Sequence, residues 1–566
     1  MTGVAAAAGT RLERWTADRV ADRLWAKDGS LWAESGKAPE EIARWLGWLD
    51  LPETMTARIP ELQHLARDVR EDGYRRAAVL GMGGSSLAPE LFSRVFGWAG
   101  GAEAAGAASA DGLELRVLDS THPDAVRGFR SWAGEQRTLF CVSSKSGSTT
   151  EPNAYQAAMA AIAPALDFIA ITDPGTALAD LARAQEFRAI VEAPPDVGGR
   201  YSALTVFGLV PAALNGVDLD GLLARARAMA AACREPDAAA NPGLRLGAAI
   251  GEAALDGRDK LTIVTSPRLA AFGDWAEQLI AESTGKAGRG VVPIVGEPAG
   301  EPDAYGDDRV FVTLRLGDEA NDAAWGEFID AMRARGSLLD EIVLDDPLDI
   351  GGEFARWEVA TAAAGIVLGI DPFDQPNVQE SKDATTELLE AFRVRGALPQ
   401  PAPLVSEPGM AVTADPAALG DAPVTVDGAI GQLLSLLEPG RDYFAILAYL
   451  PQDVEVAERL QRIRARVRDA LGVATTLGFG PRFLHSTGQL HKGGPDSGVF
   501  LQITADPAKD LPIPGWAETF GTLIAAQALG DLASLQRRGR RALRVHLADA
   551  REGLARLETM IDAALR

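Results

Sequence analysis

The hydrophobic pattern of this 566-residue chain changes near residue 75. Residues 10 to 70 show helical spacing and many tryptophans, with no convincing strand. After that point short apolar runs alternate with helical stretches, first as AAVLGMGGSS, LELRVLD, TLFCVSS, DFIAITD and RAIVEAP, and later as KLTIVTS, GVVPIVG, RVFVTLRL and DEIVLDD. Such alternation is typical of doubly wound parallel sheets. The pattern therefore predicts an α/β protein with two similar α/β units.

The remaining pattern predicts the other parts of the chain. Residues 398–426 are rich in Pro and Ala and indicate a linker or a long surface excursion. The C-terminal part again alternates strand (YFAILAYL, VFLQITA) and helix, and GAEAAGAASADG at 101–112 indicates a loop-tip insertion. The expected division is into an N-terminal helical segment, two α/β subdomains, the linker and a C-terminal α/β region, at 1–72, 73–235, 236–397, 398–426 and 427–566.

Composition narrows the possible partners and compartments. A formal charge of -24, with no basic block to offset it, argues against nucleic acid and against an anionic membrane. Cys141 and Cys233 are the only cysteines, which argues against a disulfide framework or a cysteine zinc cluster. No apolar run approaches the roughly 18 residues of a membrane span. We therefore expect a soluble, cytoplasmic protein.

The densest polar cluster is VSSKSGSTTEPN, 142–153, which places six hydroxyl side chains and a lysine in twelve residues. An apolar, strand-like run precedes it and an alanine-rich helical run follows, so a strand-to-helix turn is expected. Free backbone N–H groups and the helix dipole at such a turn favour an anion, and phosphate is the natural candidate. The alternative is a Ser/Thr-rich turn with a helix cap.

A second glycine-rich turn, LGMGGSSLAPELF, spans Leu80 to Phe92. It departs from the dinucleotide-binding fingerprint, because Ser86 takes the place of the third glycine and no acidic residue follows at the expected spacing. Gly83, Gly84 and Ser85 would still let backbone N–H groups approach a ligand. The motif alone is weak evidence of a site.

Three other stretches hold candidate catalytic groups. In DWAEQLIAESTGK, Gln278 and Glu282 share one helix face near the helix end at Gly285, where a carboxylate can serve as a general base. Arg200 follows two glycines in DVGGRYS and can clamp an anion. FDQPNVQESK places Gln375 and Lys382 around a proline turn that starts a helix. Each stretch also has a simpler interpretation. Gln278 and Glu282 can form a solvated acidic helix face, Arg200 can be an exposed arginine of a turn, and Lys382 can be a surface lysine.

Together the motifs resemble those of a known family. GMGGSSLAP, SSKSGSTTE, VGGRYSALTVFG, EQLIAESTGK and FDQPNVQESK occur in the order found in glucose-6-phosphate isomerases, and the resemblance runs from about residue 75 to 390. It implies two doubly wound parallel-sheet sugar-isomerase (SIS-type) subdomains, with an N-terminal helical segment and an α/β C-terminal extension. It also implies interconversion of glucose 6-phosphate and fructose 6-phosphate, and it suggests a homodimer.

The resemblance assigns roles to the candidate residues. Glu282 would shuttle the proton, Arg200 would face the developing enediolate, and Lys382 would lie near the ring oxygen. The residues expected to bind the substrate are Gly84, Ser85, Ser144, Lys145, Ser146, Thr149, Gln278 and Gln375. The residue chemistry agrees, because one carboxylate can make both proton transfers and a guanidinium favours the anionic intermediate over the neutral substrate. Neither a metal nor a redox cofactor is expected.

Two features depart from the common family pattern. No histidine occurs between Lys286 and Lys382, where most members have the one used for ring opening. RFLHSTGQLHKGG, further along, looks like the family's histidine segment and is especially similar to the isomerase half of fused transaldolase/glucose-6-phosphate isomerases, with His485 as the matching residue. A transaldolase barrel takes about 250 residues, so we expect isomerase activity alone. The second departure is Asn377, where the family usually has glycine.

Other assignments stay open from sequence alone. His491 and His122 are the alternatives to His485 for ring opening, and His491 is expected to bond carbonyls at a helix end. An isomerase for another hexose phosphate, or one that also accepts mannose 6-phosphate, has the same motifs. A sugar-phosphate sensor without catalysis is the rival of a different class, and the joint presence of Glu282, Arg200 and Lys382 argues against it.

Overall fold

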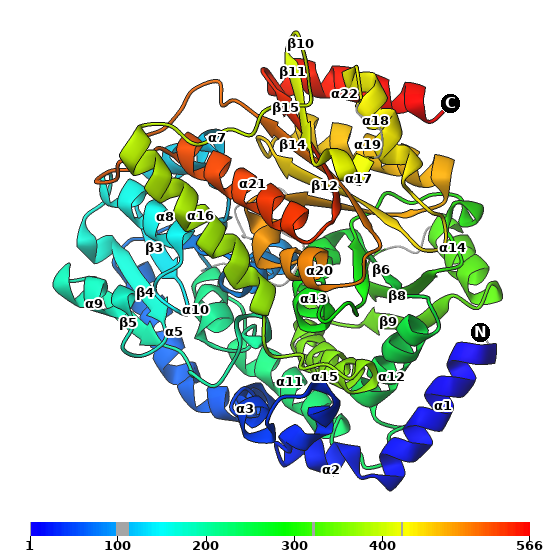
Figure 1. Cartoon of the computed structure of the whole chain (residues 1–566). Helices are drawn as coiled ribbons and strands as arrows, with labels where there is room; N and C mark the ends of the chain where they lie inside the picture. The colour runs from blue at the N-terminus through cyan, green and yellow to red at the C-terminus, as the bar shows by residue number, and fades with distance from the viewer. Residues whose placement is uncertain (1, 98–111, 318, 320–322, 420–422) are drawn as a thin grey trace. The chain divides into compact units, whose positions relative to one another are not determined.

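The chain folds into two compact units in the computed structural model, which describes residues 2–97, 112–317, 319, 323–419 and 423–566. The first unit comprises Met1–Asp119, Phe129–Thr284 and Val310–Asp374, and the second comprises Ser120–Gly128, Gly285–Arg309 and Gln375–Arg566. Each unit has sheets and helices of its own (Figure 1). The domain boundaries expected from sequence remain predictions.

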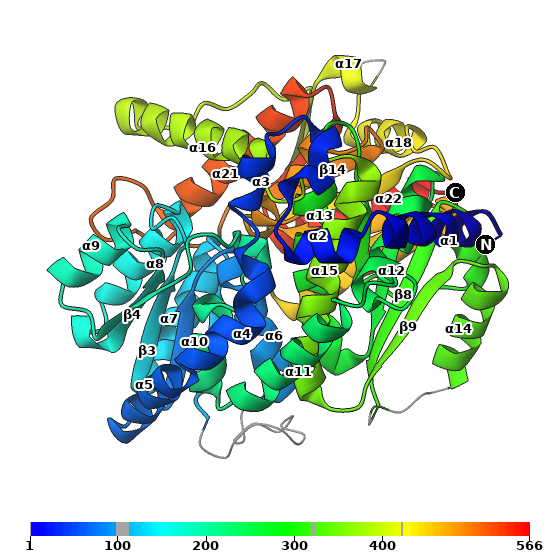
Figure 2. The same cartoon turned by 90° about the horizontal axis from the view of Figure 1, so that it is seen from below.

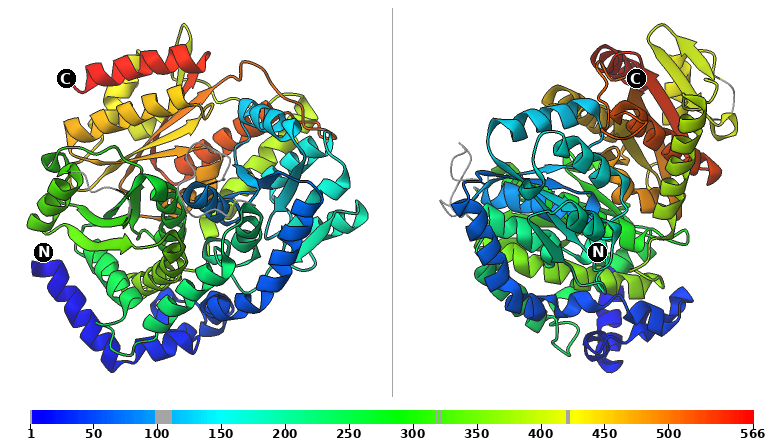
Figure 3. Two further views of the ribbon diagram at one scale, coloured as in Figure 1. Left: turned by 180° about the vertical axis from the view of Figure 1, so that it is seen from behind. Right: turned by 90° about the vertical axis from the view of Figure 1, so that its left-hand side faces the viewer.

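The N-terminal segment is helical, as its pattern predicts (Figure 3). Proline lies in the first turn of three of its helices, where its fixed φ suits the helix and its missing N–H has no intrahelical acceptor to lose. Its α-helices are α1 (Thr2–Ala17), α2 (Val20–Trp25), α3 (Pro39–Ala43), α4 (Leu51–Thr54) and α5 (Ile59–Glu71).

The first unit contains a five-stranded parallel sheet in the order β2-β1-β3-β4-β5. Its strands are β1 (Arg76–Leu80), β2 (Glu114–Leu118), β3 (Thr138–Ser143), β4 (Phe168–Thr172) and β5 (Ala189–Glu192). Strands β1, β3 and β4 are buried along their whole length, which explains their continuous apolar runs. Helices cover both faces (Figure 2), among them α6 (Leu87–Phe96), α8 (Thr150–Ala160), α9 (Ala177–Ala184) and α10 (Val206–Asn215). Helix α7 (Pro123–Glu135) begins in the second unit and ends in the first.

The second alternating series forms a second α/β layer. Strands β6 (Lys260–Thr265), β8 (Arg309–Leu316) and β9 (Leu338–Leu344) are consecutive in a sheet, and β8 and β9 are parallel. The accompanying helices are α11 (Leu219–Ala232), α12 (Pro242–Leu255), α13 (Ala270–Thr284), α14 (Ala323–Ala334) and α15 (Ile350–Leu368). Helix α15 is buried on nearly every side, in keeping with its mainly apolar sequence, although it also contains Glu353, Arg356 and Glu358.

The second unit is built on a six-stranded mixed sheet in the order β10-β11-β15-β14-β12-β13. Strands β13, β12, β14 and β15 are parallel, and β11 joins β15 antiparallel. Their bounds are β10 (Val405–Glu407), β11 (Met410–Ala414), β12 (Tyr443–Tyr449), β13 (Ala474–Phe479), β14 (Gly498–Ala505) and β15 (Arg541–Leu547). The unit also contains β7 (Val292–Val295).

The two faces of this sheet are covered by different helices (Figure 1). One face packs on α18 (Val426–Ser435), α19 (Val454–Leu471) and α22 (Ala550–Ala564), and forms a continuous apolar core. The other face packs on α21 (Phe520–Arg537). The remaining helices are α16 (Pro376–Arg395), α17 (Pro416–Leu419) and α20 (Gly488–Gly493). The fold is thus α/β, with doubly wound sheets, an N-terminal helical segment and a C-terminal extension.

The sequence predicts two irregular segments, and the structure bears on each of them differently. The predicted linker 398–426 contains β10, β11 and α17, so part of it belongs to the sheet of the second unit. The predicted loop-tip insertion 101–112 lies, apart from Gly112, outside the described residues. In the described part of the chain, no helix is long and apolar enough to cross a membrane.

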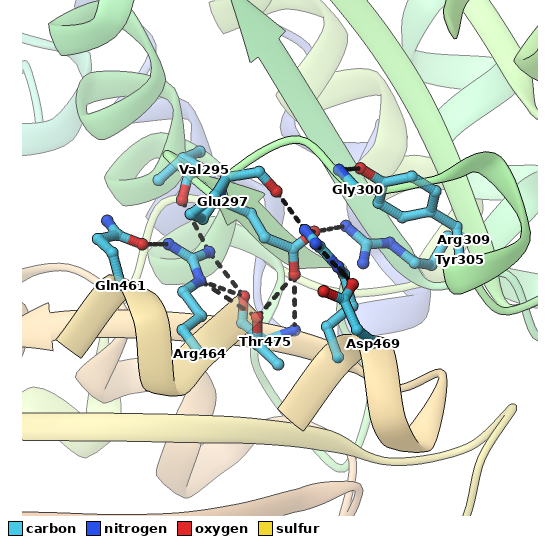
Figure 4. A network of polar contacts seen from close by, with 11 residues as sticks. Val295, Glu297, Gly300, Tyr305, Arg309, Gln461, Arg464, Asp469 and Thr475 are labelled. Carbon is cyan, nitrogen blue, oxygen red and sulfur yellow. Dashed lines mark hydrogen bonds and ion pairs between the residues drawn. The ribbon is translucent and has the colours of Figure 1, made fainter. Parts of the chain in front are cut away.

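A buried polar network in the second unit surrounds Glu297, whose side chain is only 3% exposed (Figure 4). Arg309 donates to one carboxylate oxygen at 2.7 Å. The backbone N–H and the hydroxyl of Thr475 donate to the other at 3.2 and 2.7 Å. Arg464 donates to the carbonyls of Val295 and Thr475 at 2.9 and 2.7 Å. The network ties the segment after β7 to α19 and β13.

We expect Glu297→Gln to destabilise the second unit by about 3–5 kcal/mol, because buried arginines then lose their counter-charge. Arg309 lies within hydrogen-bond distance of the carboxylate, and Arg468 lies 3.7 Å from it. Urea unfolding, with hydrogen exchange of peptides from β13, measures the loss. Glu301→Gln, at an exposed position four residues away, is the matched control. Equal stability of Glu297→Gln and the control would contradict a structural role for the network.

The same network predicts a pH dependence. Burial raises the pKa of Glu297, but Arg309 and Arg464 outweigh burial and hold this pKa below its usual value. A depressed folded-state pKa stabilises the protein above the unfolded pKa of about 4.3, and that contribution is lost as pH falls through the folded pKa. The stability difference between wild type and Glu297→Gln should therefore shrink below about pH 4.

Candidate active site

The glycine- and hydroxyl-rich motifs lie on turns that lead from strands into helices. LGMGGSS links β1 to α6 through a short 3-10 turn at Gly83–Ser85. SSKSGSTTE links β3 to α8, which begins at Thr150. Both predicted strand-to-helix turns are confirmed. Because β1 and β3 are neighbouring parallel strands, both turns lie at the same edge of the sheet.

Glu282 and Gln278 lie on α13, which ends at Thr284 as the sequence predicts. Both side chains are buried, Glu282 with 4% exposure and Gln278 with 3%. Gln278 Nε2 donates to Glu282 Oε2 at 3.3 Å, and Arg200 Nη1 lies 3.7 Å from the same oxygen. The alternatives of a solvated acidic helix face and an exposed turn arginine are therefore wrong.

Arg200 is held by a set of buried acceptors. Its Nε donates to Ser283 Oγ at 2.8 Å, and its Nη2 donates to the carbonyls of Pro372 and Asp374 at 2.6 and 2.9 Å. A neighbouring carboxylate and three neutral acceptors hold the guanidinium rigidly beside Glu282. A cation fixed in this way can stabilise a developing negative charge without reorganising.

A close backbone approach explains the glycine at position 84. A Cβ on Gly84 would lie 1.9 Å from the carbonyl oxygen of Gly199, so only glycine fits. Ser202 Oγ bonds the carbonyls of both residues, at 3.3 Å for Gly84 and 2.6 Å for Gly199. The turn of GMGGSS is thus packed against the turn that presents Arg200. Two motifs far apart in sequence form one surface.

Tryptophans of the N-terminal segment pack against aromatic residues close to Arg200 in sequence or in space. Trp48 lies 5.1 Å, ring centre to ring centre, from Tyr201, the residue after Arg200. Trp32 meets Phe373 edge-on at 5.0 Å, and Phe373 lies 5.4 Å from Tyr201. Aromatic pairs at these separations add about 0.5–1.5 kcal/mol each beyond simple burial. The N-terminal helices thus help to fix Arg200 and its carbonyl acceptors.

The turn between β3 and α8 gathers its hydroxyl groups. Ser144 Oγ donates to Thr149 Oγ1 at 3.0 Å, and Ser146 Oγ lies 3.5 Å from the same atom. Thr149 is the cap residue of α8, yet its hydroxyl makes no capping bond to the helix. Gly147 has a φ of +66°, which lets the loop curl around these hydroxyls. The simple capping alternative is therefore wrong for Thr149.

Lys145 is partly buried beside this loop. It forms an ion pair with Asp173, and its Nζ donates to the carbonyl of Pro195 at 3.2 Å. Asp173 is half-buried, and because burial outweighs the attraction to Lys145, its pKa is above the usual value. The ammonium group is thus held by the segments that follow β4 and β5.

The second unit holds the other predicted residues. Gln375 and Lys382 are exposed, the first just before α16 and the second in its second turn. This exposure agrees with the surface alternative for Lys382, and its catalytic role stays a prediction. His485 is half-buried at the end of the short 3-10 turn Arg482–His485.

An amide pair ties the histidine segment to two other motifs within the second unit. Gln489 Nε2 donates to Asn377 Oδ1 at 2.7 Å and to the carbonyl of Gly285 at 2.9 Å. In return, the backbone N–H of Asn377 donates to Gln489 Oε1 at 2.8 Å. Asn377, which departs from the family pattern, is thus bonded through its own side chain. Gly285, Asn377 and Gln489 come from three separate motifs of the sequence.

The alternative histidines have different surroundings. His491 is buried against the rings of Tyr443, Phe483 and Phe500, and neither ring nitrogen has a hydrogen-bond partner among the described residues. The expectation that His491 bonds carbonyls at the end of a helix is therefore wrong. Burial, assisted by Lys492, holds its pKa well below the usual value.

His122 is the second alternative, and it too is buried. Its Nδ1 accepts the backbone N–H of Asp124 at 3.2 Å. Burial lowers the pKa of His122. Of the three candidates, His485 is thus the only one whose side chain is partly exposed. A group that exchanges protons with a substrate needs such access.

Curated relatives of the chain bear one common name. Glucose-6-phosphate isomerase of Symbiobacterium thermophilum is 29% identical over 401 residues, which cover 61% of this chain and 87% of that protein. Glucose-6-phosphate isomerase of Thermosynechococcus vestitus is 31% identical over 358 residues, which cover 56% of this chain and 66% of that protein. The chain is homologous to glucose-6-phosphate isomerases. No family model matches it.

A solved structure supports the fold. The crystal structure of a hypothetical protein from Thermus thermophilus has a TM-score of 0.55 and 22% identity, and the match covers 69% of this chain and 97% of that one. At this identity the likeness concerns the fold alone. It agrees with the α/β architecture described above.

The structure also identifies supporting residues that the motif analysis missed. Ser283 follows Glu282 directly in the isomerase motif EQLIAESTGK, and its hydroxyl holds Arg200. The position of Ser283 directly after the predicted base was the sequence signal that could have identified this residue. Glu358 of α15 is fully buried, and burial raises the pKa of its carboxyl group well above the usual value. The apolar sequence around Glu358 was the only signal that this carboxyl is unusual. Among the described residues, no group of three or more His, Cys, Asp and Glu side chains could hold a metal ion.

Proposed function

We propose that this protein interconverts glucose 6-phosphate and fructose 6-phosphate. The homology to glucose-6-phosphate isomerases supports this activity. The observation that carries the chemistry is the buried pair of Glu282 and Arg200, 3.7 Å apart, on the two motifs that the family shares. A hexose phosphate is the substrate class. A homodimer and a cytoplasmic location are further proposals that rest on the family resemblance and on composition.

The central step is a proton transfer by Glu282. The carboxylate removes the proton from C2 of the open-chain aldose, the electron pair forms the C1–C2 double bond, and the oxygen on C1 becomes anionic. Arg200 stabilises that enediolate more than it stabilises the neutral aldehyde, and this difference accelerates the reaction. The proton returns to C1 while the hydroxyl on C2 transfers its own proton to the oxygen on C1, which leaves a carbonyl at C2.

Ring opening precedes this step. It needs a group that gives a proton to the ring oxygen while the hydroxyl on C1 loses one. We propose His485 for this role, because an imidazole can both give and accept a proton and the side chain is partly exposed. We further propose that Lys382 lies near the same ring oxygen, where an ammonium group favours the developing negative charge. Gln278 and Gln375, with Gly84 and Ser85, would bind the sugar.

One assay tests the activity directly. Purified full-length protein is incubated with glucose 6-phosphate in the presence of EDTA, and fructose 6-phosphate is measured. A parallel reaction with mannose 6-phosphate separates a strict enzyme from a dual one. We expect metal-independent turnover of glucose 6-phosphate. Saturable binding of glucose 6-phosphate without any product would instead identify a sensor.

The hydroxyl-rich loop supplies a prediction about substrate binding. Ser144→Ala and Thr149→Ala should each weaken binding of sugar phosphates and of inorganic phosphate, because each removes a charge-assisted hydrogen bond worth about 1.5–3 kcal/mol. The loss should be seen mostly in KM. Inorganic phosphate should also protect the variants less against thermal unfolding.

Thr150→Ala is the matched control for this loop. Thr150 is the first residue of α8, and its hydroxyl makes no side-chain hydrogen bond in the described part of the chain. The control should retain wild-type KM and wild-type protection by phosphate. Full protection by phosphate in Ser144→Ala and Thr149→Ala as well would show that the loop is merely structural.

A further inference from the structure

A cavity of about 380 Å³ lies in the second unit, on the face of the six-stranded sheet that α21 covers. Its walls come from β11, β14, β15, the end of β12, α21 and the segment before β10. Figure 1 shows α21 crossing this face of the sheet. None of its lining residues has been assigned to isomerisation. The volume suits a small molecule of metabolite size.

The alternation of strand β15 explains why this face is polar. Leu543, Val545 and Leu547 point to the opposite face and join the apolar core with α18, α19 and α22. The residues between them, Arg544 and His546, point to the face under α21 and line the cavity. A strand buried on both faces ordinarily has apolar residues on both. After Arg541, which begins the strand and pairs with Asp442, the sequence RALRVHL departs from that pattern only at Arg544 and His546.

Arg544 is the decisive residue. It is 93% buried, since only 7% of its surface is exposed. Its Nε donates to Thr504 Oγ1 at 3.1 Å, and it forms no ion pair within the described parts of the chain. A buried guanidinium ordinarily has a carboxylate or several carbonyls as partners. Here the two terminal nitrogens lack an acceptor among the described residues and border the cavity.

Among the described residues that line the cavity, Arg544 is the only one with a positive charge near pH 7. His546 Nδ1 bonds Thr504 Oγ1 at 2.9 Å, and its Nε2 lies 3.5 Å from the exposed carboxylate of Asp506. Burial first, and Arg544 second, lower the pKa of His546, so its ring is neutral near pH 7. Burial also lowers the pKa of Arg544, and the attraction of the Asp506 carboxylate offsets only part of this effect.

The position of the cavity is where ligands bind in open α/β sheets. Strands β12 and β14 are neighbours, and the chain leaves them in opposite directions, toward β13 and toward β15. Their carboxyl ends therefore flank a topological switch point, the usual place for a ligand crevice. Tyr449 is the last residue of β12, Thr504 is the second-last residue of β14, and Asp506 directly follows β14. All three line the cavity.

We propose that this cavity binds a small carboxylic acid with an apolar body. The carboxylate lies against the terminal nitrogens of Arg544, whose planar fork matches it in a bidentate pair. The body packs against Pro401, Pro403 and Ile524. A phosphate ester has a charge of about -1.5 to -2 at pH 7 and would meet only one cation here.

Calorimetric titration of the full-length protein tests the proposal. The probes are acetate, hexanoate, benzoate and 3-phenylpropionate, with 3-phenylpropionamide as the neutral match of the last and inorganic phosphate as the rival anion. We expect saturable binding that strengthens from acetate to 3-phenylpropionate, and none by the amide. No binding by any of the four acids would overturn the proposal. Phosphate binding that depends on Arg544 and exceeds that of every acid would overturn the ligand class.

Two variants and a control locate the site. Arg544→Gln should weaken 3-phenylpropionate binding at least about tenfold, because it removes a charge-assisted bidentate pair. Ala525→Phe, which fills the cavity from α21 without changing its charge, should do the same. Arg551→Gln, at an exposed arginine of α22, should bind like wild type. Thermal melts and isomerase turnover verify folding. Wild-type affinity in both cavity variants would place the acid elsewhere and overturn the proposal.

Discussion

Glu282→Gln is expected to lower isomerase turnover by at least about 10²-fold to 10⁴-fold, with little change in substrate binding. The amide keeps the size and hydrogen bonding of the side chain but lacks a basic oxygen. Gln278 and Arg200 contact the carboxylate directly, so the substituted side chain is held in the same place. Steady-state kcat and KM for glucose 6-phosphate measure the effect.

Glu277→Gln is the matched control, since it makes the same change five residues away on the same helix, α13. It should retain turnover within about twofold of wild type. Wild-type turnover in Glu282→Gln would end the assignment of the base. Equal losses of turnover in both variants would show that a change from Glu to Gln on α13 impairs the protein in general. Such a result would not identify Glu282 as the base.

A solvent-deuterium experiment sharpens the assignment of Glu282. A carboxylate that exchanges its proton with water during turnover puts deuterium on C2 of the aldose. We expect this label with the wild-type protein, measured by NMR of recovered glucose 6-phosphate. Turnover without label, under conditions that allow exchange, would favour hydride transfer between C1 and C2 and would leave Glu282 without its role.

The local parts of the site could be predicted from sequence because local rules determine them. Glycine and hydroxyl residues between an apolar run and a helical run indicate a turn wherever they occur. That is how the turns before α6 and α8, and the helix end after Glu282, were found. The proline that starts α16 was found in the same way.

The burial of Arg200 could not be predicted in this way. Its carbonyl acceptors, at Pro372 and Asp374, come from the far end of the first unit, and no local pattern relates them to the turn at 198–202. The same limit applies to the amide pair of Asn377 and Gln489, which joins two motifs 112 residues apart. These contacts depend on tertiary packing, so sequence spacing alone contains no signal for them.

The cavity beside Arg544 was missed for a related reason. The segment 398–426 has the composition of a linker, but β11 in it pairs with β15, and β10 pairs with β11. Strand pairing across more than a hundred residues is set by the partner edge and not by the segment itself. Only the paired sheet brings Pro401 and Pro403 toward Arg544 and encloses the cavity.

His485→Asn is expected to slow turnover of the cyclic sugar phosphate by about 10²-fold or more. It should leave proton exchange at C2 intact in an acyclic substrate analogue. The reason is that imidazole gives a proton to the ring oxygen during opening, whereas an acyclic analogue has no ring to open. Turnover of glucose 6-phosphate and deuterium exchange into the acyclic analogue are measured on the same preparation. The split between the two substrates separates an acid–base group from a residue that only maintains the fold.

Variants at the other histidines complete the test. His491→Phe keeps a ring among Tyr443, Phe483 and Phe500, and because the ring nitrogens of His491 lack partners among the described residues, it should turn over both substrates normally. His64→Asn, at an exposed position on α5, controls for the substitution itself. Equal loss on both substrates in His485→Asn would mean that His485 is structural or acts on the enediol. Normal turnover in His485→Asn would mean that another residue opens the ring.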